Sequence, residues 1–216
     1  MIIDKSTLSL EESVYLRLQE DILSGELERG QSLTESALSS KYETSRTPVR
    51  SALHRLAEEG IVRSVPNKGA VVVGIDEELL VDIYQVRMRL EGLASSLAAE
   101  RIDKESLALL EETVSLAEFY IAKRDAETLK QLDTRFHETI YRASGNQMLE
   151  RTLGELHNRI KFYRKKSLSV PARLDSSVKE HRGILEAIKR GDSVAADALT
   201  SEHIQRALNN ILKAIK

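Results

Sequence analysis

The sequence predicts a mainly α protein in two parts. An N-terminal winged helix-turn-helix with a small β-hairpin wing should be followed by a C-terminal all-α antiparallel helical bundle. Only three prolines and ten glycines interrupt 216 residues that are rich in helix-favouring types. The one convincing strand signal is IVRSVPNKGAVVVGI at residues 61–75. After it, long amphipathic helical patterns alternate with short turns, as in a helical bundle.

Three helices are expected before the hairpin, at about residues 10–24, 34–42 and 47–59. Thr34 is placed as the N-cap of the second, and Ser45 as the N-cap of the third. Two β-branched runs then flank a turn that contains Pro66 and Gly69. Because three helices and a hairpin in this order are typical of a winged helix-turn-helix, we expect residues 1–75 to form a DNA-binding domain.

Six further helices are expected, and the turn signals place their ends. Asp76, Asp103 and Asp125 are predicted N-caps, and the short turns imply antiparallel neighbours. Residues 76–216 are therefore expected to form one all-helical domain. Its predicted helices cover about residues 76–101, 103–123, 125–144, 147–169, 174–190 and 193–215.

The composition excludes several classes of protein. Without cysteine there can be no disulfide or thiolate zinc site, which is consistent with a reducing cytoplasm, the expected location. No signal peptide is visible, and no run approaches the ~20 apolar residues that span a bilayer, so no membrane partner is expected. The net charge of −2 does not indicate nucleic acid, yet residues 41–68 carry six Lys and Arg against three Asp and Glu.

The helix predicted at residues 47–59 has two unlike faces. Val49, Leu53 and Leu56 lie on an apolar face that should pack on the preceding helices. The opposite face carries arginine, which can donate two parallel hydrogen bonds to guanine, and hydroxyls, which can hold phosphates. The alternative is an ordinary solvated helix face. The candidate DNA-contacting residues are Ser45, Arg46, Thr47 and Arg50 on this helix, with Lys68 and Gly69 in the hairpin.

Residues 10–74 resemble the winged-helix domain of the GntR superfamily of bacterial transcription regulators. The matching motifs are ILSGEL, SRTPVRSAL, an L-x-x-E-G run and PNKG. The resemblance implies that Arg46, Thr47 and Arg50 contact operator DNA, and that Lys68 and Gly69 belong to the wing. A homodimer would present two such helices to the half-sites of a palindromic, double-stranded operator.

The stretch LDTRFHETIY, residues 132–141, places two polar side chains on or beside an apolar helix stripe. Asp133 and His137 are one helical turn apart, a spacing that suits two ligands of one metal ion. His181 and His203 lie on the apolar sides of the last two helices. Each is about equally far from the Gly191-Asp192 turn, so an antiparallel hairpin would bring both to the same level, ~16 Å from it.

These four side chains predict a divalent transition-metal site of three histidines and one carboxylate. Imidazole and carboxylate ligands suit Zn or Ni, with Fe or Mn as alternatives. A single inward histidine is more commonly a core residue with one polar neighbour, and four such groups would each need a separate partner. One shared ion would satisfy all four. His157, at the edge of its apolar face, is a rival ligand.

Residues 76 to about 212 resemble the FCD effector domain, an all-helical bundle of the FadR subfamily. The matching segments are VRMRLEGLASSLAAERI, LDTRFHETIYRASGNQML, EHRGILEAIKRGD and EHI. The resemblance implies open coordination positions at which a small carboxylate effector binds. It also implies that the metal ligands are Asp133, His137, His181 and His203.

A carboxylate effector needs a nearby cation. Arg87 interrupts an otherwise apolar helix stripe and is one candidate, while a bridge to Glu91, four residues on, is the equal alternative. Arg159 is a second effector candidate, from its place in the family pattern.

The sequence thus predicts a ligand-responsive, sequence-specific DNA-binding transcription regulator, and not an enzyme. One alternative is a metal sensor, in which the metal itself is the effector. An all-α metalloenzyme is less favoured, because no inward acidic residue besides Asp133 is evident as a general base.

Overall fold

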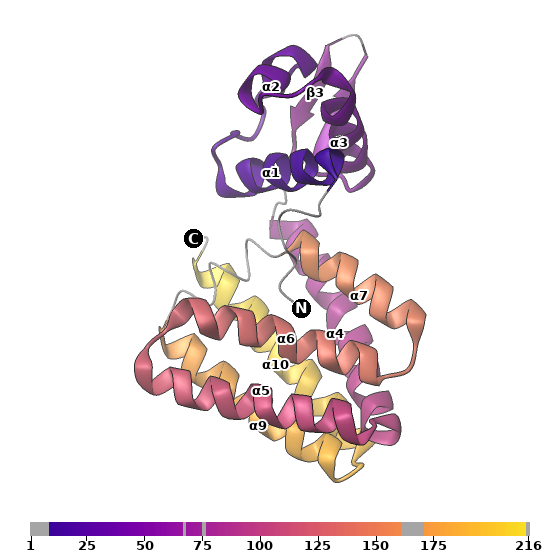
Figure 1. Ribbon diagram of the computed structural model, residues 1–216, viewed down its shortest axis with the longest axis vertical. Coiled ribbons are helices and arrows are strands. Elements are labelled where there is room, and N and C mark those ends of the chain that lie inside the picture. The colour runs from indigo at the N-terminus through magenta and orange to yellow at the C-terminus, as the bar shows by residue number, and fades with distance from the viewer. Residues whose placement is uncertain (1–8, 67, 75–76, 161–170, 215–216) are drawn as a thin grey trace. The chain divides into compact units, whose positions relative to one another are not determined.

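Helices dominate the computed structural model, which describes residues 9–66, 68–74, 77–160 and 171–214 (Figure 1). The predicted fold class is confirmed: helices and a small antiparallel wing come first, and an all-helical bundle follows. The contacts divide the chain into two units, with the boundary between Glu77 and Glu78. Among the described helices, none combines the length and the apolar character needed to cross a membrane.

The first unit has the predicted order of elements plus one short strand. The strand β1 pairs with β3, and β3 with β2, all antiparallel, so the wing is a three-stranded sheet in the order β1-β3-β2. The sequence analysis missed β1 because two residues are too few for an alternating pattern. The elements are α1 (Leu10–Ser24), β1 (Ser32–Leu33), α2 (Glu35–Lys41), α3 (Arg46–Glu58), β2 (Val62–Val65) and β3 (Gly69–Val72).

Both predicted N-cap residues in this unit lie at helix starts, but only one of them makes the capping hydrogen bond. The Thr34 hydroxyl accepts a hydrogen bond from the backbone N–H of Ala37 at the start of α2. Ser45 also lies at its predicted N-cap position, directly before α3, but its side chain makes no cap hydrogen bond. The physical reason is Pro48, which occupies the third position of α3 and has no N–H to donate to a capping oxygen.

The second unit consists of helices, most of them as predicted. Asp103 and Asp125 accept hydrogen bonds from the N–H groups of Ser106 and Thr128, which confirms both as N-caps. Asp76 and part of the predicted helix 147–169 lie outside the described residues. The helix α9 begins at Pro171 and not near Leu174, because proline fits the first turn of a helix. The helices are α4 (Glu77–Arg101), α5 (Lys104–Lys123), α6 (Ala126–Ala143), α7 (Gln147–Arg159), α9 (Pro171–Lys189) and α10 (Ser193–Ala214).

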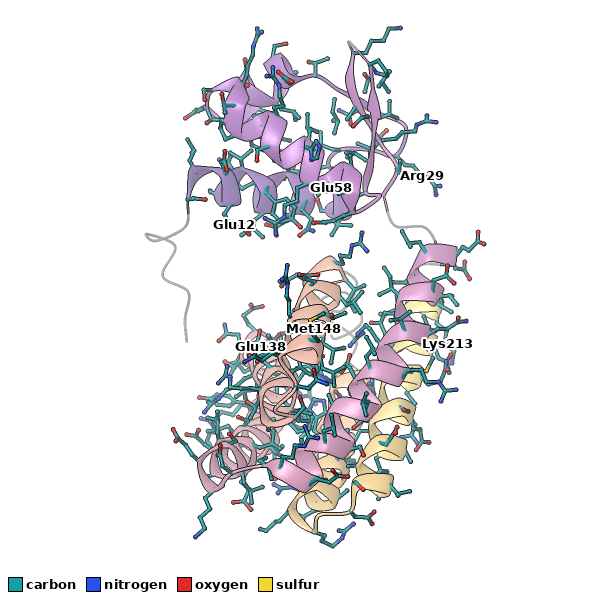
Figure 2. All side chains as sticks on the ribbon, turned by 90° about the vertical axis from the view of Figure 1, so that its right-hand side faces the viewer. Glu12, Arg29, Glu58, Glu138, Met148 and Lys213 are labelled. Atoms are coloured by element: carbon teal, nitrogen blue, oxygen red, sulfur yellow. The ribbon has the colours of Figure 1, made fainter. Side chains whose placement is uncertain are left out.

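All six described helices of the second unit contribute side chains to its core. The helix α5 packs on α6 and α9, and α9 packs on α10. Two hydroxyl groups connect α10 to α4: Thr200 donates to Ser95 at 2.8 Å, and Ser201 donates to the carbonyl of Met88 at 3.0 Å. Glu138 and Met148 lie on the outside of this unit (Figure 2). The largest core cluster is apolar and includes Leu110, Val114, Phe136, Ile140, Leu153 and Ile184.

Gly69 is required by the backbone of the wing. Its φ is +93°, and a Cβ atom there would lie 2.1 Å from the backbone oxygen of Leu33 in β1. Gly74 also has a positive φ, +71°, but a Cβ atom there would meet no atom within 4 Å. A side chain at Gly74 would therefore cause backbone strain alone, whereas a side chain at Gly69 would cause both strain and a steric clash.

We expect Gly69→Ala to destabilise the DNA-binding unit by roughly 2 to 5 kcal/mol, because strain and overlap with β1 add. Gly74→Ala is the control and should cost only about 1 kcal/mol, from strain alone. Urea unfolding of the full chain, followed by circular dichroism, measures both. Equal effects of the two substitutions would mean that β1 moves aside without cost.

Candidate metal centre and DNA-contacting face

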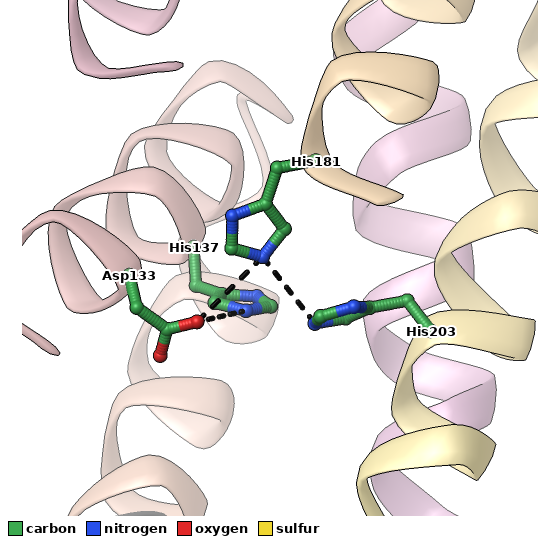
Figure 3. A group of neighbouring side chains, drawn as sticks. All are labelled: Asp133, His137, His181 and His203. Carbon is green, nitrogen blue, oxygen red and sulfur yellow. Dashed lines mark hydrogen bonds and ion pairs between the residues drawn. The ribbon is translucent and has the colours of Figure 1, made fainter. Parts of the chain in front are cut away.

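Four buried polar side chains meet inside the second unit (Figure 3). Each offers one possible ligand atom, and these atoms lie within 4.8 Å of one another. Nε2 of His181 lies 3.4 Å from Nε2 of His203 and 3.6 Å from Oδ1 of Asp133. Nε2 of His137 is 3.9 Å from the same oxygen. The structure thus brings together, from α6, α9 and α10, the four residues that the sequence analysis selected.

The chemistry of these groups fits a divalent transition ion. All four are at most 8% exposed. Burial, reinforced by the neighbouring imidazoles, holds the pKa of His181 well below its ordinary value. Burial likewise lowers the pKa of His203 to about 4, so both rings are neutral at pH 7. Metal ions bind the neutral form of imidazole, which is the state in which burial holds His181 and His203.

Two further carboxylates lie beside the Nδ1 atoms of two of the histidine rings. Oε2 of Glu91 lies 2.9 Å from Nδ1 of His137, and Oε2 of Glu180 lies 2.6 Å from Nδ1 of His203. A carboxylate beside Nδ1 favours the tautomer with its proton there, which leaves the Nε2 lone pair for a metal. The sequence analysis missed this role of both glutamates, because their contacts come from other helices.

Each of these glutamates also contacts a buried arginine. Nε of Arg87 donates to Oε1 of Glu91 at 2.8 Å, so the bridge that the sequence analysis set against effector binding is present. Among the described residues, Nη1 of Arg87 has no hydrogen-bond partner. Nη1 of Arg173 donates to Oε2 of Glu180 at 2.8 Å. Burial raises the pKa of Glu180, but contacts with His203 and Arg173 outweigh it and bring that pKa to about 2.

The other two candidates of the second unit lie on α7. His157 on α7 is buried, with its ring centre 6.2 Å from that of His137, but it is not a member of the group. Arg159, at the end of the same helix, is half-buried.

The predicted DNA-contacting residues lie on the exposed side of the first unit. The buried side of α3 is formed by Pro48, Val49, Ala52, Leu53 and Leu56, as its apolar pattern predicts. Lys68 is exposed and Gly69 is half-buried at the start of β3. Arg50 donates two hydrogen bonds to Glu35 of α2, a contact that the sequence did not indicate. The exposed candidates on and before α3 are Ser45, Arg46, Thr47 and Arg50.

Both units match known protein families. Residues 10–72 match the model of the bacterial regulatory proteins of the gntR family, and residues 82–206 match that of the FCD domain. The Nta operon transcriptional regulator of Aminobacter aminovorans is 31% identical over 187 residues, which cover 87% of each chain. The gluconate operon transcriptional repressor of Bacillus subtilis is 34% identical over 149 residues, 68% of this chain and 60% of that one.

Among solved structures, E. coli McbR/YncC shares the fold, with a TM-score of 0.76 and 24% identity over 97% of this chain and 100% of that chain. The matched family models together span both units. The chain therefore belongs to the gntR family of bacterial regulatory proteins, as a sequence-specific DNA-binding transcription regulator with an FCD domain, and is not an enzyme.

Proposed function

We propose that this regulator is a homodimer that reads a palindromic operator with α3 and responds to a small carboxylate bound beside a divalent metal in the FCD domain. The observation that carries the proposal is the convergence of four buried ligand atoms within 4.8 Å. A regulator of this kind acts in the cytoplasm, where the bacterial chromosome lies.

Asp133, His137, His181 and His203 would hold the metal. Three imidazoles and one carboxylate favour Zn or Ni over harder ions, with Fe or Mn as alternatives. When bound, the metal supplies coordination positions that a carboxylate oxygen can occupy. The role of the protein is to keep Nε2 of His137 and of His203 unprotonated and to exclude water through burial.

A carboxylate effector is supported by the arginine beside this cluster. Arg87 is buried, its Nη1 group has no hydrogen-bond partner among the described residues, and Glu91 connects it to His137. An effector that engages Arg87 would compete for the contact with Glu91 and so change how His137 is held. Arg159, half-buried on α7, is a second candidate. One relative regulates a gluconate operon, and gluconate is a small carboxylate.

The signal would pass through α4, since this helix carries Arg87 and directly follows the wing in the chain. In the proposed dimer, the two DNA-binding domains could be placed relative to each other in a way that fits the operator or in a way that does not. An effector can change operator affinity only if its own affinity differs between these two placements. The outer face of α4 also supports a dimer. Val86 and Leu93, seven residues apart, are 48% and 43% exposed, which is a common property of apolar positions that pack against a second copy.

An operator for this test is first selected from random duplex DNA with the wild-type protein. Arg50→Ala should weaken binding to this selected operator by roughly ten- to a hundredfold per half-site, because a bidentate contact with guanine would be lost. Binding to a scrambled duplex should change far less. Fluorescence anisotropy with both duplexes measures this, and circular dichroism checks that the variant is folded. An unchanged sequence preference would exclude Arg50 as a base-reading residue.

Elemental analysis of untagged protein should find about one transition-metal ion per chain. His181→Ala and His137→Ala should each lose it, while His157→Ala, the control in the same core, should keep it. The two metal-free variants should still bind operator in the absence of effector. If operator binding disappears with the metal, the ion serves the fold and not the response.

Glu91→Gln should lower metal affinity by roughly ten- to a hundredfold, since a neutral amide orients His137 and raises its basicity less than a carboxylate does. Glu138→Gln is the matched control, because this exposed carboxylate adjoins His137 only in sequence. Competition with a chelator measures both variants. Equal affinities would show that the contact between Glu91 and His137 does not serve metal binding.

A further inference from the structure

Glu35, the first residue of α2, holds Arg50 of α3 by a two-point contact. Nε of Arg50 donates to Oε1 of Glu35 at 2.6 Å, and Nη2 donates to Oε2 at 2.7 Å. Two parallel hydrogen bonds between planar groups define both the position and the plane of the guanidinium. The hydrogen bond from Arg50 also lowers the pKa of Glu35, so the carboxylate stays ionised.

The two-point geometry lets this contact stabilise the packing of α2 on α3, but solvent limits the gain, because the Arg50 side chain is 70% exposed and that of Glu35 is 27% exposed. An acidic residue beside a DNA-contacting face also repels phosphate. A role of the contact in DNA recognition would offset this repulsion.

The part of the guanidinium that Glu35 does not contact can serve such a role in DNA recognition. Arginine has five N–H groups, and Glu35 takes one from Nε and one from Nη2. The remaining hydrogens, two on Nη1 and one on Nη2, include the pair at the end of the side chain. That pair can donate to O6 and N7 of one guanine. Glu35 thus leaves the base-reading edge of Arg50 free while it fixes the other edge.

We propose that Glu35 is a positioning residue for base recognition, which directs Arg50 end-on toward a guanine of the operator. The inference rests on the proposed role of Arg50 as a base-reading residue. A guanidinium that is already oriented loses less side-chain freedom when it binds DNA. Glu35 should therefore increase discrimination between sequences although its charge weakens attraction to DNA.

The test compares Kd for the selected operator and for a scrambled duplex at fixed salt, and takes their ratio as discrimination. Glu35→Asp keeps the charge at the start of α2 but shortens the side chain by one methylene. It should lower discrimination about tenfold and leave scrambled-duplex affinity unchanged. Glu35→Ala should lower discrimination as much and bind the scrambled duplex more tightly, because a negative charge is removed.

Two controls separate positioning from charge. Glu43→Gln removes an exposed negative charge in the turn before α3 and should tighten binding to both duplexes alike. In the Arg50→Ala background, Glu35→Asp should leave discrimination unchanged within about twofold, because the residue that it positions is gone. Circular dichroism of each variant checks the fold.

The outcomes distinguish the possible failures. If Arg50→Ala leaves discrimination intact, the proposed role of Arg50 fails, and this inference fails with it. If Arg50→Ala abolishes discrimination but Glu35→Asp does not lower it, only the positioning role is overturned. If Glu35→Asp still lowers discrimination without Arg50, Glu35 contacts bases itself, as a carboxylate can with the amino group of cytosine, and positioning is again excluded.

Discussion

Polar groups buried in a helical core are costly unless each finds a partner, and the architecture of the second unit follows from how this requirement is met. Two similar chains of contacts run inward: Arg87 to Glu91 to His137, and Arg173 to Glu180 to His203. In each, an arginine neutralises a glutamate, and the glutamate orients an imidazole. The helices that carry these residues must keep a fixed register, because a shift of one residue would separate the partners.

This requirement also explains why α4 belongs to the site although it offers no ligand atom to it. Glu91 and Arg87 lie on α4, and hydroxyl contacts at Thr200 and Ser201 attach the same helix to α10. A change at Arg87 can therefore reach His137 through one carboxylate, and it can also change how α4 lies against α10. In the proposed function, coupling between an effector and the operator would require a helix that can adopt two arrangements, and α4 is the helix that follows the DNA-binding domain in the chain.

Most of the fold and the four candidate metal ligands could be predicted from the sequence, because the patterns that indicate them are local. Helical periodicity and the caps at Thr34, Asp103 and Asp125 located most helices, and the equal distances of His181 and His203 from one turn placed them together. What could not be predicted depends on tertiary contacts or on very short elements. The two-residue β1 has no period to detect, and the partners of Glu180 and Glu35 lie on other helices. Ser45 lies at the N-cap position of α3 as predicted, but the proline three residues later lacks one of the N–H groups that its side chain could bind.

In the proposed function, the formal charge of the inner cluster would favour an anionic effector. Arg87 and Arg173 offset Glu91 and Glu180, so three neutral imidazole ligands and an ionised Asp133 would carry one negative charge. A divalent cation would turn this into one positive charge inside a core of low dielectric constant, where an uncompensated charge is costly. A monocarboxylate would restore neutrality, whereas a neutral or cationic ligand of the same size would not. In the proposed function, charge balance would therefore favour small carboxylates over neutral or cationic ligands, before any specific contact with the rest of the effector is made.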